Sequence, residues 1–144
     1  MYILIIMSLL CGLEGSEEFL KKEGIRGKVY WVSGNQMPGP GKTQSPDLGI
    51  EREIYIHEVT TLDQVDGKDG FYSKIHSPLI IKILSKRNGT FKVALPPGVY
   101  SVFTKEPQGF YANLFDQNNQ INPVTVHPRK FTWMSITLDY EAAF

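Results

Sequence analysis

The sequence predicts an all-β protein, a β-sandwich of about seven short strands with two long loops. Residues 90–95 alternate apolar and polar or small side chains with a period of two, which is typical of strands with one buried face. Turn residues, mainly Gly, Pro, Asn and Asp, recur about every ten positions. No stretch has the length and period of a convincing helix, and no internal repeat is evident.

Length and composition fit a single domain that is stabilised by packing alone. The chain has 144 residues, 42% hydrophobic and 21% charged, close to ordinary globular usage. Its one cysteine, Cys11, excludes an internal disulfide and a C-x-x-C metal or redox motif. Fifteen basic residues balance fifteen acidic ones, so no net charge favours nucleic acid or an anionic membrane. The densest basic pairs are expected on solvated surfaces: Lys21-Lys22, Lys86-Arg87 and Arg129-Lys130.

Residues 1–13 predict an export segment. The run YILIIMSLLCGL is too short to span a bilayer but has the length of a signal-peptide core, although no basic residue precedes it. Cys11 lies where the acceptor cysteine of a lipoprotein would lie, but Leu10 stands where a small residue is wanted. Otherwise Cys11 is cleaved away with the segment, or the run is a first buried strand or helix. We expect an exported protein, periplasmic or held at the outer membrane by an N-terminal lipid, with a tether at residues 14–23 and the domain at residues 24–144.

The first strand is expected at residues 24–32, and a long loop follows it. Apolar residues and glycine alternate along one face of this strand: Ile25, Gly27, Val29 and Trp31. The loop, residues 34–49, is rich in Pro and Gly, which excludes regular structure. Loops of this length are functional or mobile, so its stiff core, which includes Met37 and Pro38, is a candidate contact surface.

Two more strands are separated by a polar loop. Residues 51–60, EREIYIHEVT, predict a strand by their alternation. Residues 61–71 are polar and end in two turn dipeptides, which predicts a loop, and residues 71–76 form a short ordered segment. Residues 79–84, LIIKIL, are apolar on both faces apart from Lys82, which predicts a central strand.

Residues 88–104 predict a hairpin. Asn88-Gly89 is a turn dipeptide because both residues tolerate positive φ. The strand that follows cannot continue past Pro96-Pro97, because proline has no N–H to give to a ladder. Residues 99–104, rich in β-branched and aromatic residues, form the second strand, so we expect a hairpin closed by Pro-Pro-Gly.

The last third of the chain holds the second long loop and two strands. Residues 106–122 form the loop, in which Phe110, Tyr111 and Phe115 lie among Asn and Gln. A short strand is expected at residues 124–126, and a longer one at residues 131–140. The longer one carries four apolar residues on one face: Met134, Ile136, Leu138 and Tyr140.

In this order the motifs resemble the carboxypeptidase regulatory-like domain, over roughly residues 24–140. An opening I-x-G-x-V strand is matched by Ile25, Gly27 and Val29. The motif G-x-F-x-x-x-L-x-P-G-x-Y is matched by Gly89, Phe91, Leu95, Pro97, Gly98 and Tyr100. More narrowly, the chain resembles small, exported, stand-alone members of this family in Bacteroidota, which have no assigned activity.

The resemblance implies a seven-stranded, transthyretin-like (prealbumin-like) Greek-key β-sandwich. It also implies a structural or interaction module without catalytic residues, often attached to secreted enzymes or envelope transporters. The chain departs from the family in the loop of residues 34–49, where the family usually has a short connection. The resemblance therefore implies no partner site at that edge.

Motifs for catalysis and metal binding are absent. The three histidines, His57, His76 and His127, share no spacing that favours a metal site, and we expect no metal and no cofactor. The transthyretin-like fold also carries a hydrolase of the urate pathway, but this chain ends in YEAAF and lacks the Tyr-Arg-Gly-Ser tail of those enzymes. The Asn-rich residues 116–120 lack the glycine and the closing glutamate of an EF-hand calcium loop. The loop with Asp66 and Asp69 has two carboxylates close together and glycines that let it fold back, which leaves a calcium site there as an alternative.

The aromatic residues of the second long loop are the main binding candidates. Exposed there, Phe110, Tyr111 and Phe115 could stack on a sugar or anchor a protein partner. Alternatively they fold inward and plug the open end of the sandwich, and Trp31 and Trp133 are expected in the core. We predict a non-catalytic binding or accessory module of the bacterial cell envelope that recognises a protein partner through loops or a sheet edge. The alternatives are a carbohydrate-binding module and a hydrolase with a convergent His/Asp site.

Overall fold

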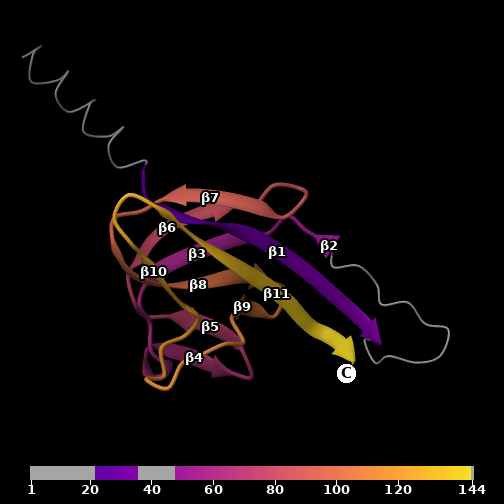
Figure 1. The fold of residues 1–144 in the computed structure, drawn as a ribbon. Coiled ribbons are helices and arrows are strands. Elements are labelled where there is room, and N and C mark those ends of the chain that lie inside the picture. Colours follow the sequence, from indigo (N-terminus) through magenta and orange to yellow (C-terminus); the bar gives the residue numbers. More distant parts are fainter. Residues whose placement is uncertain (1–21, 36–47, 144) are drawn as a thin grey trace, which may run out of the picture.

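The described part of the chain forms two β-sheets that face each other (Figure 1). It comprises residues 22–35 and 48–143 of a computed structural model. Eleven strands and one 3-10 turn, η1 (Leu62–Gln64), lie in these residues. Among them, no helix has the length and hydrophobicity needed to cross a bilayer. The predicted all-β, sandwich-like architecture is confirmed, with more strands than the seven expected.

Sheet A is built around the first strand. Its members are β1 (Gly24–Asn35), β2 (Leu48–Gly49), β7 (Thr90–Ala94) and β11 (Phe131–Ala143). The central strand β1 runs parallel to β11 on one side and antiparallel to β7 and β2 on the other. Ile25 and Val29 of β1 are wholly buried, as the alternation predicted, so Arg26 and Lys28 face away from the core.

Sheet B contains the remaining strands. They are β3 (Glu53–Glu58), β4 (Val65–Lys68), β5 (Phe71–Ile75), β6 (Leu79–Leu84), β8 (Gly98–Glu106), β9 (Gly109–Tyr111) and β10 (Pro123–Val126). The order is β4-β5-β9-β8-β3-β6, and β10 also pairs with β8. The outermost described strands of this order are therefore β4 and β6.

The position of β6 corrects the prediction of a central strand at residues 79–84. Among the described strands β6 pairs only with β3, so its other side is an edge. Its apolar residues on both faces suggested burial from both sides. Instead Leu79, Ile80 and Leu84 are 49%, 42% and 59% exposed.

The predicted hairpin of residues 88–104 is also wrong, because β7 and β8 belong to different sheets. The Asn88-Gly89 turn does form, with Gly89 at φ 89° and the Asn88 side chain accepting a hydrogen bond from the Thr90 N–H. After β7 the prolines end the ladder, and the chain crosses to the other sheet. The Tyr100 hydroxyl donates to the Pro96 carbonyl oxygen at 2.6 Å and fixes this crossing.

Two segments predicted as loops contain short strands. β4 lies within residues 61–71, and β9 lies within residues 106–122. β4 reads VDGK and has low intrinsic strand preference, so its pairing with β5 depends on tertiary context. β9 is held between β5 and β8, a pairing that local sequence does not encode.

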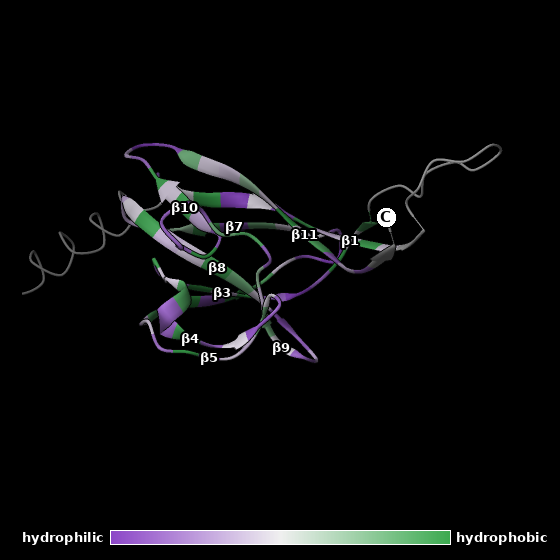
Figure 2. Ribbon diagram, turned by 90° about the horizontal axis from the view of Figure 1, so that it is seen from below, coloured by the Kyte–Doolittle hydropathy of each residue, from purple (hydrophilic) through white to green (hydrophobic). Residues whose placement is uncertain are grey.

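The main core lies between the sheets, which Figure 2 shows as two layers with β1, β7 and β11 in one and β3, β8 and β5 in the other. Ile25 and Val29 of sheet A meet Ile54 and Ile56 of sheet B, and all four are fully buried. A second, smaller cluster includes Tyr72, Phe103, Ala112 and Ile121. Ala112 and Ile121, at the two ends of the segment 112–121, therefore pack into this second cluster and not into the main core.

A polar group joins the two sheets inside the sandwich, and we call Arg52, Glu106 and Tyr140 the inter-sheet clamp. The Glu106 side chain is fully buried, and the Arg52 Nε donates to its two oxygens at 3.2 and 3.1 Å. The Tyr140 hydroxyl, from sheet A, donates to Glu106 Oε1 at 2.6 Å. Arg52 also lies over the ring of Trp31, 5.7 Å from its centroid.

Candidate functional site

The three aromatic residues predicted to bind a ligand have three different environments. Tyr111 is 5% exposed in the main core, and its hydroxyl donates to Asp139 Oδ1 at 3.3 Å. Phe110 packs edge-on against Tyr55, with ring centroids 4.9 Å apart, and Lys105 lies over it. Phe115 is 62% exposed. The three rings do not share one surface: Tyr111 lies in the main core, Phe110 is partly buried against the second cluster, and Phe115 is exposed.

Tyr111 is buried because it belongs to β9, where it pairs with both neighbouring strands. Its ring contacts Phe71 and Tyr140, with centroids 4.9 and 5.1 Å away. Burial raises the pKa of the Tyr111 hydroxyl, and the nearby Asp139 carboxylate raises it further. Tyr111 therefore supports the fold and remains neutral at physiological pH.

The turn after Phe115 is closed by its own side chain–backbone bonds. Asp116 Oδ1 accepts the N–H groups of Asn118 and Gln120, each at 2.9 Å. The fully buried Ile121 anchors the segment, and its N–H donates to the Thr60 carbonyl at 2.7 Å. This turn holds Phe115 in place and uses the Asp116 carboxylate for its own backbone, which favours the Asn-rich turn over a calcium loop.

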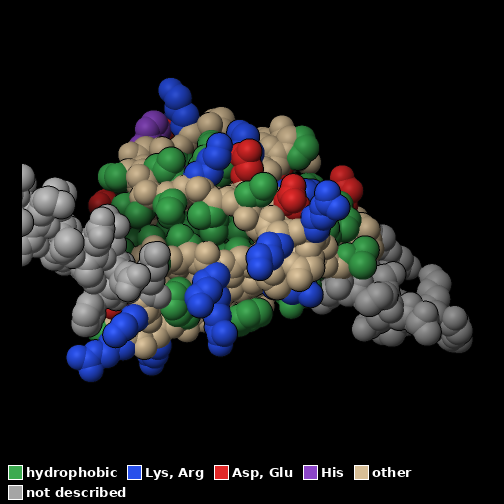
Figure 3. Space-filling model, turned by 90° about the horizontal axis from the view of Figure 1, so that it is seen from above, with side chains coloured by type: hydrophobic (Ala, Val, Ile, Leu, Met, Phe, Trp, Pro, Cys, Tyr) green, Lys and Arg blue, Asp and Glu red, His purple; other side chains and the backbone are tan. Residues whose placement is uncertain are grey.

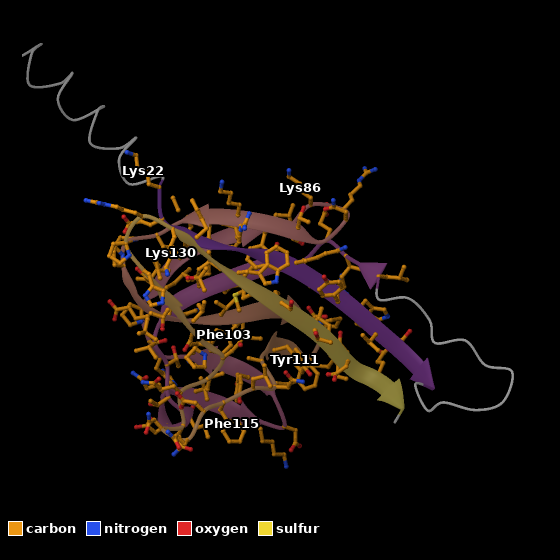
Figure 4. The ribbon with its side chains drawn as sticks, viewed as in Figure 1. Lys22, Lys86, Phe103, Tyr111, Phe115 and Lys130 are labelled. Carbon is orange, nitrogen blue, oxygen red and sulfur yellow. The ribbon has the colours of Figure 1, made fainter. Side chains whose placement is uncertain are left out.

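Phe115 lines a cleft of about 510 Å³ between the β4–β5 hairpin and residues 112–115. Figure 4 shows Phe115 at the end of the molecule where β4 and β5 lie, far from Lys86. The lining mixes apolar and polar side chains: Val65, Tyr72, Phe115, Lys68, Asp69 and Asn113. One exposed ring beside charged and amide groups can pack on the apolar face of a ligand while its polar groups are hydrogen-bonded.

Three predicted site residues cannot be placed. Met37 and Pro38, the core of the first long loop, lie outside the described residues. Cys11 and the whole predicted export segment also lie outside them. Their roles stay predictions.

The histidines do not form one site. His57 is buried, and its Nδ1–H donates to the Ser77 carbonyl at 3.0 Å. Burial lowers the pKa of His57 below 6.5, against an opposing effect of that hydrogen bond. His76 pairs with Asp66 at 3.0 Å on the surface, and His127 is exposed. Within residues 22–35 and 48–143, no three His, Cys, Asp or Glu side chains gather in a way that could hold a metal ion.

The outer edge of β6 is a surface that the sequence did not predict. The Ser85 N–H donates to the Arg52 carbonyl, and Glu53 pairs with Leu84. Because N–H groups alternate in direction along an antiparallel strand, those of Lys82 and Leu84 point away from β3. Figure 3 looks onto the edge formed by β6 and β7 and shows hydrophobic side chains gathered there. A run of apolar residues next to the turn Asn88-Gly89 signals a strand, but it does not reveal which side of the strand is free.

Sheet A presents a second unpredicted surface. Trp133, expected in the core, is 54% exposed on the outer face of β11. The register places it beside Arg26, and Arg26 beside Lys92. The alternation in β1 already assigned Arg26 to the face opposite Ile25, but the neighbours of that residue depend on strand pairing.

No protein-family model, curated protein or solved structure matches the chain. What can be stated of its class is therefore a small all-β domain of two sheets.

Proposed function

We propose that the protein is a non-catalytic binding module of the bacterial cell envelope, which recognises an extended segment of a protein partner at the outer edge of β6. The observation that carries this proposal is the exposure of Leu79, Ile80 and Leu84 on a strand with no described neighbour on its outer side. Apolar edge strands offer backbone donors and acceptors to a further strand, and apolar side chains to its residues.

The protection of β6 is weak, which supports partner binding over a merely exposed edge. Natural edge strands avoid unwanted pairing through charged residues, prolines and bulges. In β6 the charge is Lys82, which lies 3.7 Å from Glu53 and over the ring of Tyr55. The pairing of β6 with β3 has a bulge at one end, where Ile56 pairs with Ile81 and His57 with Leu79, so that Ile80 has no partner in β3. From Ile81 to Leu84 the pairing with β3 is regular, and Lys82 is the one charged residue of β6.

We also propose that the domain is a carboxypeptidase regulatory-like domain with transthyretin-like topology. The motif residues support this, because Ile25, Val29, Phe91, Leu95 and Tyr100 are all buried in the main core. The export of the chain and the lipid anchor at Cys11 rest on the pattern of residues 1–13. A binding role suits a family that supplies modules to secreted and envelope proteins.

Carbohydrate binding in the cleft is the second candidate. The exposed Phe115 ring favours it, together with the polar side chains of Lys68, Asp69 and Asn113 in the same lining. Aromatic rings with neighbouring hydrogen-bonding groups are typical of small polar ligand sites. A hydrolase with a convergent His/Asp site has no comparable support, since the Asp66–His76 pair stands apart from the buried His57.

The test is to select extended peptides from a random library on the full chain and measure their affinity by fluorescence anisotropy. The informative variant is Leu84→Pro. It removes a backbone N–H that points away from β3 and makes no hydrogen bond to that strand. We expect at least about a tenfold loss, or 1.4 kcal/mol, because a strand that is added to the edge loses a backbone bond and a side-chain contact. The matched control Leu114→Ser removes an equally exposed leucine elsewhere and should bind normally.

Three outcomes separate the candidates. Loss with Leu84→Pro but not with Phe115→Ala supports the β6 edge. Peptides that lose binding only with Phe115→Ala, or neutral oligosaccharides that bind the wild type and not Phe115→Ala, assign recognition to the cleft. The edge proposal is contradicted if no peptide can be selected and the β6 edge is also not occupied by a second copy of the chain. Such self-pairing would appear as a fall in the molecular mass on dilution.

A further inference from the structure

The outer face of sheet A carries an ordered set of basic and aromatic side chains, which we call the basic face. Strand register places Trp133, Arg26 and Lys92 in one row across β11, β1 and β7. Ser135, Lys28 and Thr90 form the next row. Neighbouring strands lie about 4.8 Å apart and residues i and i+2 about 6.7 Å apart, so these side chains occupy one compact patch.

The cations of the basic face have no opposite charge beside them. None of Arg26, Lys28, Lys86 or Lys92 pairs with a carboxylate in the described part of the chain, where the ion pairs involve other residues. Around the two rows, the outward positions carry no Asp or Glu: Arg26, Lys28, Tyr30, Thr90, Lys92, Ala94, Phe131, Trp133, Ser135 and Thr137. The acidic residues of β11, Asp139 and Glu141, follow farther along the strand, beyond the part that lies opposite β7 across β1. Lys and Arg side chains gather along the side of sheet A, at the lower margin of Figure 3. A protein with zero net charge therefore has a locally positive face.

A groove of about 230 Å³ crosses the basic face beside Trp133. Arg26, Lys86 and Lys92 contribute to its lining, and Gly27 contributes backbone alone. The groove therefore has the Trp133 indole on β11 and cations on β1, on β7 and in the β6–β7 turn. An occupant must offer an apolar face to the indole and negative groups to the cations.

The aromatic rings of the basic face differ in whether a cation of the protein already lies over them. Lys92 lies 4.4 Å from the centroid of Phe131, and Lys28 lies 5.1 Å from that of Tyr30, so a cation already covers each of these rings. Trp133 is 54% exposed, and no Lys or Arg of the described residues is placed over its ring. Proteins that bind single-stranded nucleic acid stack successive bases on several rings, so one free indole argues against that ligand. Membrane docking needs apolar side chains that project from the surface, and here the free ring lies along a groove.

We propose that the basic face binds an acidic polysaccharide, a chain of sugars that carries carboxylate or sulfate groups. One sugar ring packs its apolar C–H face on Trp133, as amphipathic rings do on indole. Acidic groups of that sugar and its neighbours meet Arg26, Lys92 and Lys86, and hydroxyl groups of Ser135 and Thr90 lie in reach of the chain. The proposal depends on neither the β6 edge nor the cleft, because the basic face is formed by β1, β7 and β11 and by Lys86 of the β6–β7 turn.

The experiment measures binding of the full chain to immobilised heparin and polygalacturonate over a series of salt concentrations, with dextran as the neutral polymer. We expect both polyanions to bind, with affinity falling steeply as salt rises, and dextran not to bind. The double variant Arg26→Ser/Lys92→Ser should lose at least about tenfold in affinity, and Trp133→Ala about fivefold. The matched control Lys74→Ser/Lys105→Ser removes the same charge from sheet B and should bind like the wild type.

Melting curves establish that each variant is folded, and all four substituted residues of the two double variants are exposed. The proposal is overturned if neither polyanion binds. It is also overturned if the sheet B control loses as much affinity as the sheet A variant, because binding would then follow net charge alone. Tighter binding of oligothymidylate or of phosphatidylglycerol vesicles to the same residues would assign the basic face to nucleic acid or membrane instead.

Discussion

The inter-sheet clamp and the basic face both place an arginine beside a tryptophan, but only the arginine of the clamp has a carboxylate partner. In the clamp, Arg52 has a buried carboxylate and a stacked indole, and its partners come from both sheets. On the basic face, Arg26 lies beside Trp133 and Lys92 with no carboxylate near. A cation with a buried partner contributes to the stability of the fold, whereas unpaired cations gathered on a surface have interactions left to make.

Removing the cation of the clamp should have the largest effect. The variant Arg52→Leu leaves the Glu106 carboxylate buried without its positive partner, which costs about 3 kcal/mol of unfolding free energy. Urea unfolding followed by tryptophan fluorescence measures it. The control Arg87→Leu removes an exposed arginine from the β6–β7 turn and should change stability by less than about 0.5 kcal/mol. Equal stability of the two variants would mean that the clamp does not stabilise the fold.

Tyr140→Phe should have an intermediate effect. It keeps the ring contacts with Trp31 and Phe71 and removes a hydrogen bond to a charged group, which costs about 1.5 kcal/mol. Burial and the bond to Glu106 raise the pKa of Tyr140 to about 12. The unfolded chain loses this proton near pH 10, so the stabilisation is fully present below pH 10 and is lost as the pH rises toward 12.

Urea titrations of wild type and Tyr140→Phe at several alkaline pH values measure this difference. It should stay constant up to about pH 10 and shrink above it. A difference that does not depend on pH would show that the hydroxyl is not held neutral by the clamp.

Strand alternation predicted the buried faces of β1 and β11 correctly, although Trp133, expected in the core, lies on the outer face of β11. It assigned Ile25 and Val29 to the core and hence Arg26 to the surface. It could not predict that Arg26 lies between Trp133 and Lys92, because β1 and β11 are far apart in sequence and pair in parallel. Register between distant strands is set by the whole packed fold.

The candidate sites were predicted less well than the strands for a similar reason. Composition alone grouped Phe110, Tyr111 and Phe115, but β9 turns Tyr111 into the core while the Asp116 turn leaves Phe115 outside. Likewise, the apolar β6 sequence suits a central or an edge position, and only the absence of a further described strand decides between them. Pairing partners, which sequence patterns do not report, determine which residues are free to bind.

The smallest effect on stability is expected from the double variant Arg26→Ser/Lys92→Ser. It relieves repulsion among unpaired cations but loses the contact of Lys92 with Phe131, a cation–π interaction of about 0.5 kcal/mol. The two effects oppose each other, so the unfolding free energy should change by less than about 0.5 kcal/mol, with slight stabilisation at low salt. Urea unfolding at low and high salt measures it. A loss of unfolding free energy as large as that of Arg52→Leu would mean that these cations stabilise the fold. An almost unchanged unfolding free energy would mean that the fold does not need the charges of the basic face. Recognition is then the role that these charges can serve.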